Sequence, residues 1–209
     1  MKNTVIASLG AAMLVAAANA AVIVNQPNDT GNGYTSQDFT DFPAYSGSCF
    51  DDFTLSGQTQ LGALTVFGQD GAGGNSGANV AVVARIFLSP DLTSGAVATV
   101  VGTQVGGDLV FDMSSVTLNA GTYWLSAQVV RPFGGGGQWF WNTSTTTNGA
   151  HSMYHNPGGG FGLGTSPVST TAFGNPDWDM AFVMEGTEVP APGALALLGA
   201  AGLLRRRRR

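Results

Sequence analysis

The chain has 209 residues, of which 31 are glycine, and only 10% of its residues are charged. The net charge of −5 conceals an asymmetry: residues 29–188 hold two arginines and all 13 acidic residues, which gives this part a net charge of −11. This acidic, lysine-free part excludes binding to nucleic acid or anionic lipid, because both need clustered Lys and Arg.

The first 20 residues have the three parts of a secretory signal peptide. Lys2 supplies one positive charge, residues 5–18 are apolar, and Ala18-Asn19-Ala20 fits the small-x-small pattern that precedes cleavage. The apolar run is short for a transmembrane helix, and polar residues follow it. We therefore expect a signal peptide over residues 1–20, cleavage after Ala20 and export by the general secretory route.

Residues 21–187 have the composition of one all-β domain. Runs rich in Val, Thr, Phe and Trp alternate with clusters of Gly, Asn, Asp, Ser and Pro, and no segment is convincingly helical. The expected strands cover residues 22–24, 50–55, 61–67, 80–88, 97–104, 108–111, 122–130, 138–142 and 177–185. This pattern predicts a two-sheet antiparallel β-sandwich of jelly-roll or Ig-like type.

Residues 143–171 are rich in Thr, Gly and Asn, and we expect a long loop there, either a binding loop or a disordered segment. Cys49 is the only cysteine, which excludes an intrachain disulfide. Its position next to Phe50 predicts that the thiol is buried as a small apolar group.

Trp139 and Trp141 share one face of the expected strand 138–142. Aromatic rings fill sandwich cores, and their faces also stack on sugar rings. The pair therefore has two interpretations, core packing or an exposed carbohydrate-binding platform. We take it as the candidate platform, with the polar residues 142–148 supplying hydrogen bonds to sugar hydroxyls.

Two acidic pairs are the candidates for metal binding or acid–base chemistry. Asp51 and Asp52 would meet Asp177 and Asp179 if the first and last strands pair. Carboxylate oxygens at strand ends are ligands that calcium prefers, so calcium is the one cofactor that the sequence suggests. The same residues also fit a glycosidase acid–base pair, or carboxylates that cap turns and face solvent.

Other catalytic motifs are missing. His151 and His155 lie among Gly and Pro, without the glutamate of a zinc-protease helix. Gly74-Asn75-Ser76-Gly77 has the wrong spacing for a nucleophile elbow, and the glycine runs lack the Lys-Ser/Thr of a phosphate loop. We predict a protein that is not an enzyme, with a secreted glycan-active hydrolase using paired Asp residues as the alternative.

Residues 188–209 form a tail made of three successive parts. Pro190 and Pro192 precede the uncharged apolar residues 193–204, and five arginines follow. As a helix the apolar run would extend roughly 18 Å, against a bilayer core of about 30 Å. A short transmembrane anchor and a cleaved processing signal both fit, and the arginines would stay on the cytoplasmic side.

This tail resembles the PEP-CTERM sorting signal of exported bacterial proteins. The matching residues are Val189, Pro190, Ala191, Pro192, Arg205, Arg206, Arg207, Arg208 and Arg209. Val-Pro-Ala-Pro stands where the family most often has Pro-Glu-Pro. The resemblance implies recognition by an exosortase-type membrane enzyme, and attachment to the membrane through a C-terminal helix, transiently or stably. It also implies a location at the cell surface or in the exopolysaccharide matrix.

Three internal segments carry a second resemblance. Phe50-Asp51-Asp52-Phe53, residues 118–125 and Asp179-Met180-Ala181-Phe182 are similar to segments of small β-sandwich ectodomains that precede such tails. The resemblance implies a structural or adhesive surface protein, with extracellular polysaccharide as a partner, and it carries over no catalytic residues.

Overall fold

The computed structural model describes residues 20–190. The predicted signal peptide, apart from Ala20, and the tail from Ala191 onward lie outside the described residues. Between residues 20 and 190 no helix is long and apolar enough to cross a membrane. The expected C-terminal transmembrane helix falls on residues 193–204 and therefore stays a prediction.

Within residues 20–190 the chain forms 17 strands and three short 3-10 helices. The first strands and helices are β1 (Ala21–Gln26), β2 (Gly33–Thr35), β3 (Gln37–Phe39), η1 (Pro43–Tyr45), β4 (Ser48–Leu55), β5 (Thr59–Val66), β6 (Gly68–Asp70), η2 (Ser76–Ala78) and β7 (Ala81–Phe87). They are followed by β8 (Ala98–Val101), β9 (Thr103–Val105), β10 (Asp108–Asp112), β11 (Thr117–Leu118), β12 (Gly121–Arg131), β13 (Trp139–Ser144), β14 (Met153–His155), β15 (Val168–Ser169), η3 (Thr170–Phe173), β16 (Asp179–Met180) and β17 (Phe182–Glu188).

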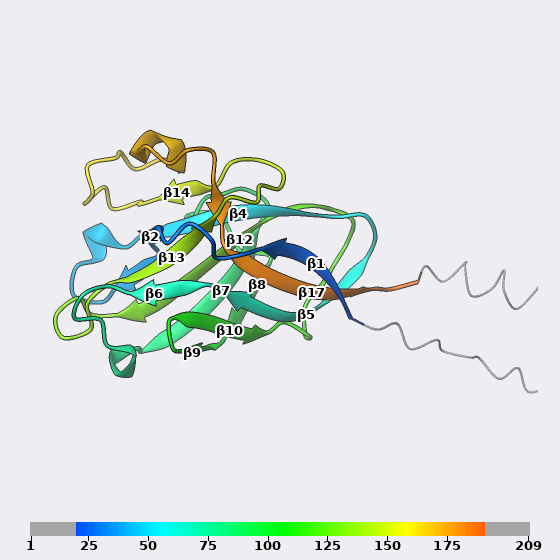
Figure 1. Ribbon diagram of the computed structural model, residues 1–209, viewed down its shortest axis with the longest axis horizontal. Helices are drawn as coiled ribbons and strands as arrows, with labels where there is room; N and C mark the ends of the chain where they lie inside the picture. Colours follow the sequence, from blue (N-terminus) through cyan, green and yellow to red (C-terminus); the bar gives the residue numbers. More distant parts are fainter. Residues whose placement is uncertain (1–19, 191–209) are drawn as a thin grey trace, which may run out of the picture.

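The strands pair into three sheets. One has the order β1-β17-β5-β10-β9, with β11 also on β5, and the second has the order β15-β14-β4-β12-β7-β8, with β3 also on β12. A third, smaller sheet is built around β13, which pairs with β16, β2 and β6. Pairing is antiparallel except between β12 and β3. The prediction of an all-β, sandwich-like fold is confirmed, and the third sheet was not expected (Figure 1).

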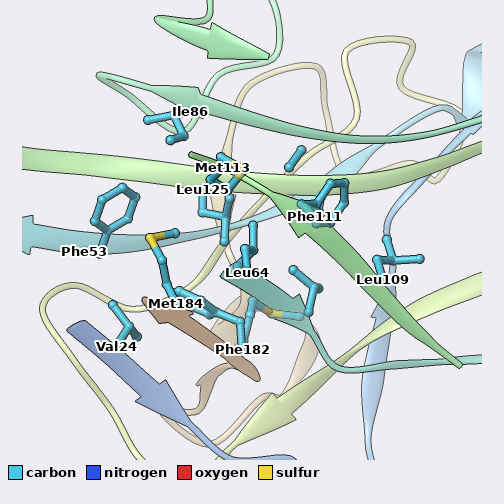
Figure 2. Close-up of a cluster of buried hydrophobic side chains, with 14 of the residues drawn as sticks. Val24, Phe53, Leu64, Ile86, Leu109, Phe111, Met113, Leu125, Phe182 and Met184 are labelled. Atoms are coloured by element: carbon cyan, nitrogen blue, oxygen red, sulfur yellow. The ribbon is translucent and has the colours of Figure 1, made fainter. Parts of the chain in front are cut away.

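The hydrophobic core takes its side chains from both larger sheets. Leu64 on β5 and Met184 on β17 come from one sheet, and Phe53 on β4 and Leu125 on β12 come from the other (Figure 2). All four are fully buried. Alternate residues of a strand point to the same face, and these four point to the faces that the two sheets turn toward the core. Each such side chain contributes about 1.5–3 kcal/mol through burial.

Several sequence-based boundaries differ from the structure. The single strand expected over residues 97–104 is two strands, β8 and β9, which belong to different sheets. The strand expected over residues 80–88 is one residue shorter at each end, as β7, and the excluded residues Val80 and Leu88 are 72% and 69% exposed. The last expected strand is broken at Ala181, because β16 pairs with β13 whereas β17 pairs with β5 and β1. The expected loop 143–171 contains β14, which extends the second sheet beside β4.

Gly68 lies against the buried indole of Trp139. A Cβ atom at this position would overlap that indole and would lie 2.7 Å from the carbonyl oxygen of Phe140. We predict that Gly68→Ala lowers the free energy of unfolding by about 1–3 kcal/mol, because overpacking displaces a side chain that has no free space. Gly95→Ala is the matched control, since a Cβ there meets nothing within 4 Å. Equal urea midpoints for the two variants would contradict the prediction.

Candidate functional site

The predicted sugar platform is not on the surface. Trp139 and Trp141 are both 0% exposed and belong to the hydrophobic core. Their indole N–H groups donate to the carbonyls of Gly107 at 2.7 Å and Ala181 at 2.8 Å. A sugar ring has no face on which to stack, so the carbohydrate-binding assignment of these two residues is corrected to core packing.

The most exposed aromatic rings lie elsewhere, in a continuous series of exposed, half-buried and buried rings that we call the aromatic row. In spatial order its members are Phe39, Phe133, Phe42, Tyr45, Phe161, Tyr154, Phe173 and Tyr34. Neighbouring ring centroids are 5.2–6.5 Å apart, and all pairs except the last meet edge to face. This is the preferred geometry of aromatic pairs, so the rings hold one another in place.

Two pockets are lined by the aromatic row. The larger, about 310 Å³, is lined by Phe39, Phe42, Tyr45, Phe133, Gln138 and Phe161. The smaller, about 260 Å³, is lined by Tyr34, Thr35, Tyr154, Phe161, Leu163 and Phe173. Phe161 belongs to both, so the two pockets adjoin. Both lie on elements at the end of the molecule opposite the start of β1 and the end of β17 (Figure 1).

The larger pocket presents three rings to solvent. Phe42 is 49%, Tyr45 43% and Phe133 48% exposed. Exposed rings of this size cost solvation free energy, and grouped apolar exposure marks a binding surface more often than scattered exposure does. The half-buried amide of Gln138 adds one polar group to the wall. The pocket therefore combines apolar faces with a hydrogen-bonding group, as small-ligand sites do.

Buried Asn156 fixes the loops that carry these rings. Its side-chain N–H groups donate to the carbonyls of Ala44 at 2.9 Å and Ser46 at 2.8 Å, which flank Tyr45. Its side-chain oxygen accepts the backbone N–H of Phe161 at 3.1 Å. One amide thus joins η1 to the loop after β14. On the far side of the pocket, the backbone N–H groups of Phe133 and Gly134 donate to the carboxylate of Asp41 at 2.7 and 2.9 Å.

Of the predicted acidic residues, the structure brings Asp51 and Asp179 together. Both carboxylates accept a hydrogen bond from the side-chain amide of Gln26, at 3.4 and 3.1 Å. All three side chains are at least 99% buried. Burial, and then the neighbouring carboxylate of Asp179, raise the pKa of Asp51 well above its usual range. Burial likewise raises the pKa of Asp179 to about 6.

The other two acidic residues are not part of this cluster. Asp52 points to the opposite face of β4, where its carboxylate accepts the backbone N–H of Ala150 at 2.7 Å. The side chain of Asp177 is 79% exposed, and its carboxylate lies 3.7 Å from the imidazole of His151. Among the described residues, no group of three His, Cys, Asp or Glu side chains is arranged to hold a metal ion. The burial of Asp51 and Asp179 keeps a glycan from reaching them, which argues against the glycosidase alternative.

The predicted sorting motif lies only partly within the described residues. Val189 and Pro190 follow the last strand, both are exposed, and the backbone N–H of Val189 donates to the carbonyl of Gln58 at 2.8 Å. Ala191, Pro192 and the five arginines lie outside the described residues. Sequence analysis missed the aromatic row, although isolated aromatic residues in polar, glycine-rich loops were a signal for it.

Asn156→Ala tests whether this residue organises the site. The change removes a donor from the carbonyl of Ser46 and the acceptor of the Phe161 N–H, whereas the carbonyl of Ala44 keeps the N–H of Gly160. We expect the free energy of unfolding to fall by about 1–3 kcal/mol. The near-ultraviolet circular dichroism of the Tyr and Phe side chains should weaken in the folded state. Asn148→Ala, at an exposed side chain, is the control and should change stability by less than about 0.5 kcal/mol. An Asn156 variant with unchanged stability and spectrum would exclude this role.

Comparison of the chain with family models, curated proteins and solved structures gives no match. Function is therefore inferred from the residues and their geometry.

Proposed function

We propose that the protein is an exported cell-surface or exopolysaccharide-matrix protein of structural or adhesive type. In this proposal, the aromatic row makes a weak contact with a neutral extracellular polysaccharide. The observation that carries it is the exposure of Phe42, Tyr45 and Phe133 around one pocket of about 310 Å³. The contact is assigned to these rings in place of the buried tryptophans.

The chemistry of a sugar ring suits this pocket. A pyranose has an apolar C–H face that packs on an aromatic ring, and hydroxyls at its rim that need donors and acceptors. Phe42 and Phe133 supply the apolar faces, whereas the Tyr45 hydroxyl and the Gln138 amide supply hydrogen bonds. Rings braced by edge-to-face contacts lose little entropy on binding, which favours a contact that forms without rearrangement.

The scarcity of basic side chains favours a neutral polysaccharide over an anionic one. Between residues 20 and 190 the basic side chains other than histidine are Arg85 and Arg131, and neither lines the pockets. A polyanionic glycan would be repelled by the surrounding carboxylates, because its charges would find no positive partner. A neutral polysaccharide avoids this repulsion.

Delivery to the surface belongs to the same proposal. The signal peptide of residues 1–20 directs export, and residues 21–187 form a sandwich of jelly-roll or Ig-like type. Residues 188–209 act as the PEP-CTERM-like sorting signal, with an exosortase-type enzyme as partner. The ordered pattern of a proline motif, an apolar run and an arginine block supports this part of the proposal.

The glycan contact is tested by affinity electrophoresis through gels that contain neutral or acidic polysaccharides. We expect retardation by at least one neutral polysaccharide. The double variant Phe42→Ala, Phe133→Ala should bind at least about tenfold more weakly, equivalent to about 1.4 kcal/mol. Val101→Ala, at a residue that is 70% exposed on β8, is the matched control and should bind as wild type does. The proposed contact fails if no polysaccharide retards the wild type, or if the double variant binds equally well.

The fate of the tail is tested by mass spectrometry of the envelope-associated protein. We expect the mature surface form to lack Arg205 to Arg209, because a short apolar run between a proline motif and arginines fits a processing signal. Processing would also remove five positive charges and leave a strongly acidic protein. Recovery of an intact arginine block on the envelope-associated protein would instead favour a permanent tail anchor.

A further inference from the structure

Three buried side chains from separate strands converge at one place in the sandwich. Gln26 ends β1, Asp51 lies in the middle of β4, and Asp179 begins β16. β1 pairs with β17 so that Gln26 is opposite Phe182, and β16 lies beside β4. The pairing of β1 with β17 and the proximity of β16 to β4 therefore hold the three side chains in a fixed relation.

No cationic side chain within residues 20–190 balances the charge of the two carboxylates. Arg131 forms its ion pair with Asp70 at 2.6 Å, and the guanidinium of Arg85 donates to Gln128 at 2.6 Å. The remaining titratable groups near the carboxylates are Asp52, His151 and Cys49, none of which is permanently positive. A buried carboxylate that lacks a cationic partner is costly, so a proton or a bound ion must compensate.

Each of the three side chains also has one oxygen without a hydrogen-bond partner. These atoms are Oε1 of Gln26, Oδ1 of Asp51 and Oδ1 of Asp179, all buried and unpaired among the described residues. The second oxygen of each carboxylate is held by a backbone N–H, from Met180 for Asp51 and from Asn148, at 2.6 Å, for Asp179. The two carboxylates are thus oriented by the backbone, and one acceptor on each is left free.

We propose that Gln26, Asp51 and Asp179 bind a calcium ion through these unpaired oxygens. Calcium takes carboxylate and amide oxygens and tolerates irregular geometry, whereas zinc prefers nitrogen and sulfur ligands. This ligand set differs from the one suggested by the sequence. Gln26 is added, Asp52 is removed because it faces away from the cluster, and Asp177 is removed because its side chain is exposed. The site is independent of the aromatic row, so either proposal can fail without the other.

The ion would join three separate strands. β1 is an edge strand that pairs with β17 alone, so a ligand at its last residue would tie it to β4 as well. An ion that binds only the folded state stabilises it by mass action. The calcium-free protein should therefore melt earlier, and β1 should lose protection from hydrogen exchange before the core strands do.

The test uses the full chain purified in detergent and stripped with a chelator. Calorimetric titration with calcium chloride should show binding close to one ion per chain. Calcium at about a hundred times its dissociation constant should raise the melting temperature by about 5–10 °C over the chelated protein. Asp51→Asn and Asp179→Asn each remove one charged ligand at constant shape, and both should abolish the shift.

Asp52→Asn and Asp177→Asn are the matched controls and should keep the calcium shift. Absence of calcium binding by the wild type overturns the proposal, and this result does not require any variant to fold. An undiminished shift in Asp179→Asn overturns it as well. If a shared proton compensates the pair instead, calcium will add nothing. Because folding raises these pKa values, the stability of the chelated protein would then be highest at acid pH and would fall as the pH rises through about 6.

Discussion

The structure depends on the pairing of β12, the longest strand, along both of its edges. It pairs with β4 on one side and β7 on the other, and β3 continues the contact at its C-terminal end. Alternate residues Leu125, Ala127 and Val129 are fully buried and face the core. Because a shift by one residue would move these apolar side chains to the opposite face, the buried pattern fixes the register of the second sheet. The positions of Asp51 on β4 and of the β3–η1 loop follow from that register.

The sequence predicts those parts of the fold in which one strand is long enough to show alternation. β12, β7 and β4 were expected near their observed bounds for this reason. Strands of two or three residues, such as β3 and β14, have no periodic signal of their own and exist because a distant segment pairs with them. The third sheet was missed for the same reason, since three of its four members are that short.

The candidate sites show the same division between local and distant information. Alternation places Trp139 and Trp141 on one face of β13, but it does not say which face is covered, and the core covers theirs. β4 and β16 belong to different sheets and do not pair, so the strand pairing assumed from the sequence does not explain the meeting of Asp51 with Asp179, although this meeting was among the sequence-based expectations. Gln26 was not, since a neutral amide at a strand end carries no motif. The aromatic row depends on Asn156, whose three hydrogen bonds join loops that are more than a hundred residues apart in the chain.

Scarcity of positive charge links the two proposed sites physically. Both arginines in residues 20–190 already have partners, one on a carboxylate and one on an amide. Consequently the buried pair Asp51 and Asp179 has no internal counter-ion, and the aromatic row has no cation to attract an anionic glycan. The same composition thus favours a divalent ion inside the sandwich and a neutral ligand on its surface. The proposed ion site lies at the end of β1 and directly before β17, so calcium would stabilise the end of this strand pair that is opposite the exit of the chain at Glu188.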